Sequence, residues 1–282
     1  MSFESFLLDH ETAIRLGFFF GAFVIMALWE FVAPLRVPGT SKVIRWSNHL
    51  GLVTMNIVLV RVLFPLAAVA LAVYASERGI GLLNVISVPY LLAFVGSFLV
   101  LDLAVYLFHL LFHAVPALWR VHRLHHADLD IDVTTGVRFH PIQMVLAVIV
   151  KSIVILVLGP PALAVLTFEV GSHAITLFNH GNVKIAPALD RVLRWLIVTP
   201  DMHRVHHSIH RTETDSNFGF VLPWWDRLFG TYRAEPAAGQ VRMVVGIESF
   251  RTDRDQWLDR LVLNPVLDEP DPQLISPSQK VE

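Results

Sequence analysis

The chain has 282 residues, and 54% of them are hydrophobic, whereas soluble domains average about 45–50%. Its 22 Lys and Arg residues against 24 Asp and Glu leave no basic excess to neutralise phosphates, which argues against nucleic-acid binding. The absence of cysteine excludes disulfides, thiolate zinc sites, iron–sulfur clusters and cysteine nucleophiles. We therefore expect a membrane protein in which nitrogen or oxygen atoms hold any metal.

Four apolar regions are long enough to cross the bilayer, since a spanning helix needs about 20 residues. They are residues 13–35, 50–75, 88–108 and 141–178. The N-terminal residues 1–11 lack the pattern of a cleaved secretory signal, so we expect the first region to remain in the mature protein. The fourth region is interrupted by Gly159, Pro160 and Pro161, which end a helix and predict a helical hairpin.

The distribution of basic residues predicts the orientation. The loop after the first region carries Arg36, Lys42 and Arg45, whereas the loop after the second carries only Arg78 beside Glu77. Because cytoplasmic loops are enriched in Lys and Arg, we expect the first loop, the end of the third span and residues 181–282 to be cytoplasmic. A short helix is predicted over residues 187–199, lying either on the membrane surface or in a soluble core.

Histidines carry the main functional signal. Twelve of the 14 lie between His109 and His210, and they include one H-x-x-x-H pair and two H-x-x-H-H boxes. Because residues three and four apart share one helix face, we expect each box to direct its three imidazoles toward one point. These eight candidate metal ligands are His109, His113, His122, His125, His126, His203, His206 and His207.

A ninth ligand is expected at His180, where the hairpin returns to the same side of the membrane. Its neighbours Asn179 and Asn182 are candidates to hold a water or to orient its ring. Eight or nine nitrogen donors suffice for two divalent ions and exceed what one zinc requires. The boxes contain no carboxylate, and an all-nitrogen shell suits an iron pair that activates dioxygen. No catalytic residue is expected beyond the metal ligands.

Other polar residues near the boxes have several possible roles. His140, before Pro141, and His173, seven residues before His180, could each be a ligand, a proton relay or a helix-end contact. Asp102 lies two helical turns before His109 and is a candidate to line a substrate path. The remaining histidines, His10, His49 and His210, are expected to lie outside the site.

Together with the stretch from Asp215 to Tyr232, these boxes resemble the fatty acid hydroxylase and sterol desaturase superfamily of membrane non-haem di-iron enzymes. The resemblance covers roughly residues 45–233 and includes Phe139-His140-Pro141 and Asn179-His180-x-Asn182. It implies iron bound by the box histidines, dioxygen as co-substrate and electrons from a separate donor, either cytochrome b5-like or a ferredoxin with its reductase. Some relatives have a further ligand where this chain has Thr176, and no fused cytochrome b5 motif is present.

The fold class that we predict is therefore all-α. It is a polytopic membrane helix bundle of about four spans or hairpins with a cytosolic, His-rich metal-binding cap. We divide the chain into N-terminal spans (1–87), a catalytic region (88–235) and a C-terminal cytosolic tail (236–282). The predicted function is O2-dependent hydroxylation, or the related desaturation, of a lipid such as a fatty acyl chain or sterol taken from the bilayer. The alternatives are a haem-binding electron carrier and a divalent-metal transporter.

The segment from Asp215 to Tyr232 is rich in aromatic residues but too polar to span a membrane. Its aromatic side chains could pack the cap against the membrane interface, where Trp and Tyr are favoured. Alternatively, the segment supports the metal site, and Asn217 and Asp226 donate or accept hydrogen bonds with ring nitrogens of the last box.

Overall fold

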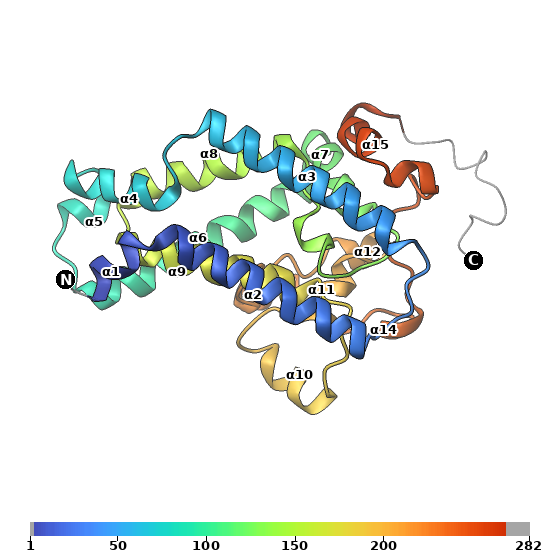
Figure 1. The fold of residues 1–282 in the computed structure, drawn as a ribbon. Coiled ribbons are helices and arrows are strands. Elements are labelled where there is room, and N and C mark those ends of the chain that lie inside the picture. The colour runs from blue at the N-terminus through green and yellow to red at the C-terminus, as the bar shows by residue number, and fades with distance from the viewer. Residues whose placement is uncertain (1–2, 269–282) are drawn as a thin grey trace.

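The computed structural model describes residues 3–268, which form helices and no strand apart from two isolated bridges (Figure 1). Five stretches are long and apolar enough to cross a membrane. They comprise α2 (Glu11–Val32), the stretch Lys42–Val85 with α3 (Lys42–Leu63), α4 (Ala68–Glu77) and α5 (Leu82–Val85), then α6 (Tyr90–Ala114), α8 (Pro141–Leu158) and α9 (Ala162–Asn179). The all-α fold is confirmed, and the chain is a multi-pass membrane protein.

The second apolar region is not the single helix that we predicted. It begins eight residues earlier, at Lys42, and is divided at Phe64–Ala67 into α3 and α4. Pro65 explains the break, because proline has no backbone N–H and disfavours helical geometry in the preceding residue. The N-terminal end of α3 is capped by Ser41, whose side chain accepts a hydrogen bond from the Ile44 N–H.

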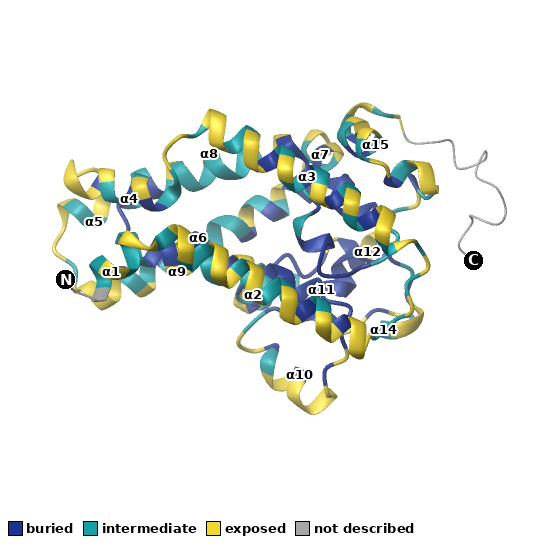
Figure 2. Cartoon of the chain, viewed as in Figure 1, coloured by how far each residue is buried: buried dark blue, intermediate teal, exposed yellow. Residues whose placement is uncertain are grey.

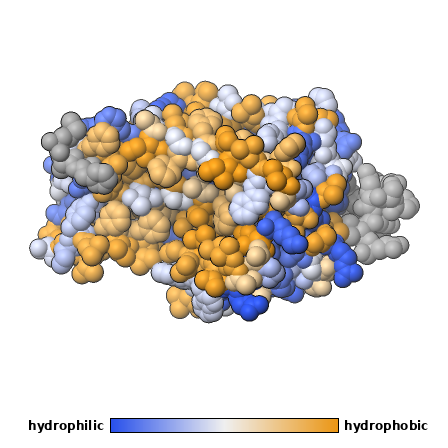
Figure 3. Space-filling model, turned by 60° about the horizontal axis from the view of Figure 1, so that its bottom comes forward, coloured by the Kyte–Doolittle hydropathy of each residue, from blue (hydrophilic) through white to orange (hydrophobic). Residues whose placement is uncertain are grey.

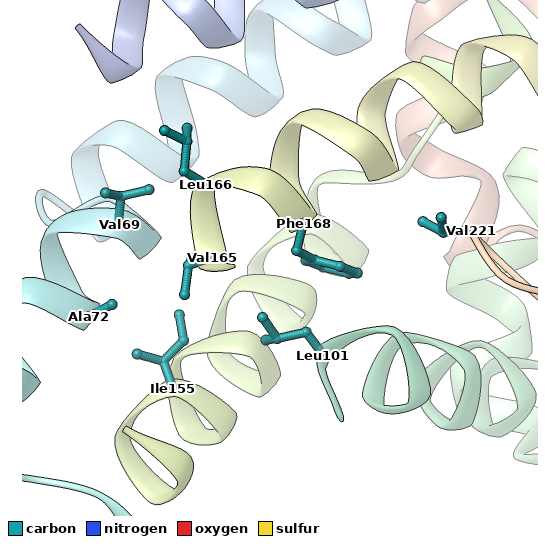
Figure 4. Close-up of a cluster of buried hydrophobic side chains, with 8 residues drawn as sticks. All are labelled: Val69, Ala72, Leu101, Ile155, Val165, Leu166, Phe168 and Val221. Atoms are coloured by element: carbon teal, nitrogen blue, oxygen red, sulfur yellow. The ribbon is translucent and has the colours of Figure 1, made fainter. Parts of the chain in front are cut away.

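The fourth region is divided where Gly159, Pro160 and Pro161 predicted. Gly159 ends α8 in the left-handed region, with φ of 66°, and Pro161 caps α9. Both helices pack against α4 and α6, so these two helices lie within the hairpin. Packing among these elements buries one apolar cluster, shown in Figure 4. Its members are Val69, Ala72, Leu101, Ile155, Val165, Leu166, Phe168 and Val221.

Charged side chains within the spans pair with one another. Glu169 on α9 accepts hydrogen bonds from Lys151 on α8, at 2.5 Å, and from Arg15 on α2, at 2.9 Å. Such pairing stabilises charges at this depth, because an unpaired charge there is costly.

The remaining helices form a cap at the end of the bundle opposite α1 (Phe3–Asp9), α4 and α5 (Figure 1). They are α7 (Pro116–His126), η1 (Thr135–Val137), α10 (Pro187–Leu193), α11 (Pro200–His206), α12 (Arg211–Thr214), α13 (Trp224–Leu228), α14 (Gly239–Arg242), η2 (Asp253–Gln256), α15 (Leu258–Leu263) and η3 (Asn264–Val266). Buried residues concentrate around α11 and α12, whereas α2 and α3 expose much of their surface (Figure 2).

The described part of the expected C-terminal tail, residues 236–268, packs against the cap and α3. Arg123 of α7 donates hydrogen bonds to Asn264, and Arg138 donates one to Gln256. These residues therefore help to enclose the H-x-x-H-H box that α7 carries.

Candidate metal centre

Four chain segments bring the histidines together at the cap end of the bundle. α6 carries one pair near its end, α7 and α11 carry the two boxes, and His180 caps the end of α9. Both box helices begin with proline in the first turn, where the missing N–H costs no hydrogen bond. At α11, Thr199 also caps the helix by accepting a hydrogen bond from the Met202 N–H.

Nine buried histidines form two groups, and the ring nitrogens within each group lie within 4.8 Å of one another. They are the nine that the sequence singled out. The first group contains His109, His113, His122, His126 and His206, and the second contains His125, His180, His203 and His207. Each group could hold one metal ion, since imidazole nitrogen is a common ligand for divalent transition metals.

Neither H-x-x-H-H box directs all three imidazoles toward one point, contrary to our expectation. In the α7 box, His122 and His126 belong to the first group, whereas His125 belongs to the second. At 3.6 residues per turn, positions i and i+4 lie about 40° apart around the helix, whereas i+3 and i+4 lie about 100° apart. Each box therefore serves both groups and holds them side by side.

Oxygen acceptors fix the orientation of six of the nine rings through Nδ1. Four of these acceptors are backbone carbonyls, one is the Asp215 carboxylate and one is the Gln143 side chain. The pairs are His109–Phe218, His113–Asp215, His122–Gln143, His125–Arg138, His180–Thr176 and His206–Ser216, at 2.7–3.2 Å. A carbonyl or carboxylate can only accept, so Nδ1 carries the proton and Nε2 is left as a bare lone pair.

These lone pairs face one another. His206 Nε2 lies 3.0 Å from His109 Nε2, and His180 Nε2 lies 3.2 Å from His125 Nε2. Neither contact can be a hydrogen bond when both rings donate through Nδ1, so the two nitrogens repel each other unless a cation lies between them. The buried His113 Nε2 likewise has no hydrogen-bond partner. The donor set therefore fits a metal ion in each group.

Burial keeps these rings neutral. It lowers the pKa of His180 to about 4 and the pKa values of the box histidines outside the spans well below their usual range. Neutral imidazole is the form that binds metal. The crowding of four or five ring nitrogens within 4.8 Å leaves no room for a porphyrin between two axial histidines, which argues against a haem site.

Asn217 and Asp226 support the site differently from what we expected. Neither bonds to a histidine ring: Asp226 accepts hydrogen bonds from the Phe218 and Gly219 N–H groups, both at 2.8 Å, and from Thr231. Asn217 donates to the carbonyls of Met202 and Arg233. Both side chains thus hold the backbone whose carbonyls orient the rings.

Asp102 anchors the same segment to α6 and does not line a path to the histidines. Its carboxylate is fully buried and accepts hydrogen bonds from the N–H groups of Val221 and Leu222 and from Trp225 Nε1. Three donors satisfy a charge that would otherwise be costly at this depth.

The other candidates lie outside both groups. His140 caps α8 by accepting a hydrogen bond from the Ile142 N–H, and its Nε2 bonds to the Val262 carbonyl, so it is a helix-end contact. His173 is exposed on α9, with its ring against Phe19.

The polar side chains next to His180 make no hydrogen bond to its ring. Thr176 donates its hydroxyl to the Ser172 carbonyl and orients His180 only through its backbone oxygen. Asn179 donates to the Phe220 carbonyl, and Asn182 pairs with the backbone of Arg36.

Two ring partners were missed from the sequence. Asp215 was noted only as the start of the aromatic-rich segment, and it lies 102 residues from its partner His113. Gln143 follows His140 by three positions, but nothing in its sequence neighbourhood distinguishes it from any other helix residue.

Comparison with known proteins identifies the family. The model of the family described as fatty acid hydroxylase matches residues 94–231, which contain all nine grouped histidines. The chain belongs to the fatty acid hydroxylase superfamily. This confirms the resemblance seen in the His boxes.

Relatives of this fatty acid hydroxylase family member include human alkylglycerol monooxygenase, 31% identical over 50% of this chain and 30% of the relative. Ornithine lipid hydroxylase OlsE of Rhizobium tropici is 31% identical over 52% of this chain and 44% of its own. Cholesterol 25-hydroxylase of Rattus norvegicus is 24% identical over 56% of this chain and 52% of its own. The matches thus span only about a third to a half of these relatives. No solved structure matches the chain.

Proposed function

We propose that this protein is a membrane di-iron oxygenase that hydroxylates a lipid supplied by the bilayer. One observation carries the proposal: within each of two adjoining groups of buried, neutral imidazoles, Nε2 lone pairs face one another at 3.0–3.2 Å. In this proposal the first group holds one iron and the second group holds the other. The names of the relatives, which are lipid hydroxylases and monooxygenases, support hydroxylation over desaturation.

The iron pair, when bound, supplies the activation of dioxygen that breaks an unactivated C–H bond. The chain itself would bind and orient the metal through ring nitrogens, while the Nδ1 partners keep six of the nine rings in one tautomer. The second group offers four ring nitrogens, whereas the first offers five. At position 176, where some relatives have a further ligand, this chain has a threonine whose hydroxyl bonds to the backbone. The ion in the second group therefore has fewer protein donors and more room for a non-protein ligand.

Hydroxylation of one C–H bond by O2 also consumes electrons and protons and releases water, so the reaction requires a reductant. We propose a separate one-electron donor of the cytochrome b5 or ferredoxin class. We also propose that the cap faces the cytoplasm, where Arg36, Lys42 and Arg45 place the first loop by the positive-inside rule. The substrate would reach the cap laterally from the adjoining leaflet.

The test combines metal content with product analysis. Purified protein in nanodiscs should contain two irons per chain and show no haem absorption band. His125→Ala and His206→Ala should each lower the iron content, because each removes a nitrogen from a different group. His210→Ala is the matched control, since His210 is exposed and outside both groups.

Lipids extracted from aerobic cells that express the protein should contain a hydroxylated species that cells expressing His206→Ala lack. Zinc in place of iron, a haem band, or identical lipid profiles in the two strains would each overturn the proposal. Full iron content in both histidine variants would overturn the ligand assignment.

A further inference from the structure

A row of exposed apolar side chains lies beside the metal centre on two segments that pack together, α10 with the residues after it and α13 with Phe229. We call this surface the α10–α13 face. Its members are 45–69% exposed. They are Leu189, Val192, Trp195, Leu196, Trp224, Leu228 and Phe229. So many large apolar residues on one exposed surface indicate contact with something apolar.

Specific contacts hold the two segments in one rigid surface. Trp224 Nε1 donates a hydrogen bond of 2.8 Å to the Trp195 carbonyl. The Arg227 guanidinium lies 3.7 Å from the Trp195 ring centre and 4.0 Å from that of Tyr232. The exposed apolar residues are therefore held in place by a bonded scaffold.

Both segments belong to the cap, and both contact membrane helices within the spans. Asp102, which accepts hydrogen bonds from the α13 segment, lies about 18 Å before the end of α6 at ~1.5 Å per residue. Phe229 stacks on Tyr106, also within α6. Leu193 of α10 packs against the cluster that contains Met26 of α2. The face thus lies at the level of the spans.

The views agree with this placement. In Figure 1, α10 projects sideways from the cap, below α2 and α11. Figure 3 brings that side forward and shows apolar surface over much of it, with hydrophilic surface gathered nearer the C-terminal end.

The charges around the face favour a lipid surface over a second copy of the chain. Lys184 and Arg191 are exposed. The acidic residues of segments 184–196 and 222–232 are Asp190 and Asp226, and both are buried. Exposed cations beside apolar side chains and Trp rings match the headgroup region of an anionic membrane, whereas two copies of a basic face would repel each other.

We infer that the α10–α13 face is embedded in the headgroup and upper acyl layer of the bilayer, with Val192, Trp224 and Leu228 in contact with lipid. Its depth would be about 5–10 Å, as for other interfacial segments. The inference does not depend on which metal or substrate the centre takes.

The absence of cysteine from the chain makes site-directed spin labelling a direct test. Single cysteines are placed at Val192 and Leu228, and each labelled protein is reconstituted in nanodiscs of phosphatidylcholine and phosphatidylglycerol. Val58 is the control for a lipid-facing position within a span, and Val241, exposed on α14, is the control for a position in water. Size-exclusion profiles identify variants that fail to fold, and the two test positions are independent of each other.

Labels at Val192 and Leu228 should collide readily with oxygen, and with a water-soluble nickel chelate about tenfold less often than the label at Val241, because hydrocarbon excludes polar solutes. Nickel accessibility equal to that at Val241 would overturn the inference. So would dipolar broadening between labels on separate chains, because a second copy would then cover the face. Neither outcome alters the metal content, so the proposed hydroxylase function is tested separately.

Discussion

Replacement of Asp226 by asparagine is the sharpest test of how the cap holds the metal centre, because Asp226 acts on the histidines only through the backbone. Its carboxylate accepts three hydrogen bonds, from the Phe218 and Gly219 N–H groups and from Thr231. Phe218 then accepts a 2.9 Å hydrogen bond from His109 Nδ1. Asparagine keeps one acceptor oxygen and points an NH2 group at a donor, so at least one hydrogen bond to a charged group is lost.

A lost hydrogen bond to a buried charged group costs about 1.5–3 kcal/mol. The Gly219 backbone approaches the carboxylate closely, since a Cβ at that position would lie 2.6 Å from an Asp226 oxygen. We therefore expect Asp226→Asn to shift the Phe218 carbonyl and to weaken metal binding about 10–100-fold, as changes to ligand-supporting residues do.

The assay is iron retention during titration with a chelator, together with the thermal unfolding midpoint in nanodiscs. Asp259→Asn is the control, because Asp259 is a hydrogen-bonded carboxylate that is exposed on α15, where it pairs with Arg254. It should behave like the wild type. If Asp226→Asn retained iron with wild-type affinity, the backbone route from this carboxylate to His109 would be refuted.

Two further predictions concern buried charge. Arg45→Met should lower the free energy of unfolding by about 3–5 kcal/mol, because it leaves the buried carboxylates of Asp128 and Asp132 without the partner that they contact at 2.7 and 2.6 Å. The control Arg254→Met breaks an exposed ion pair and should leave the unfolding midpoint unchanged. Equal shifts of the midpoint in the two variants would contradict the argument. Burial raises the pKa of Asp226 from 3.8 to about 6, so the stability that comes from protonating this carboxyl in the fold is complete below pH 3.8 and is lost as the pH rises through 6. The stability difference between metal-free wild type and Asp226→Asn should therefore shrink by about 2 kcal/mol from pH 4 to pH 6, and a constant difference would show that the carboxylate does not titrate there.

The parts of the fold that could be predicted from the sequence depend on local chemistry. The break at Gly159–Pro161 requires only the backbone properties of glycine and proline, and the apolar runs require only the thickness of the bilayer. Pro65 is the same kind of local signal, but the break that it causes was not predicted, because the apolar region around it is long enough to be read as one continuous span. The cap helices after His180 are short, and α10 ends at Leu193, so length and periodicity gave a weaker guide there.

The candidate metal centre could likewise be predicted in part from the sequence. Imidazole is a rare side chain with distinctive chemistry, so its repeated spacing identified the nine residues that the fold brings together. How each box divides between two groups depends on which direction α7 and α11 face, and this is set by the packing of distant segments. The sequence spacing separates one histidine of each box from the other two, but it does not say which group each one faces.

The partners of the rings were the least predictable part, and the reason is chemical. Four of the six Nδ1 partners are backbone carbonyls, which every residue possesses, so no residue type marks them. What the sequence does display are the side chains that hold those carbonyls in place, such as Asn217 and Asp226. We assigned them to the rings because a polar residue near a metal site is usually read as a direct partner. In this cap, side chains such as Asn217 and Asp226 fix the backbone, and backbone carbonyls orient four of the histidine rings.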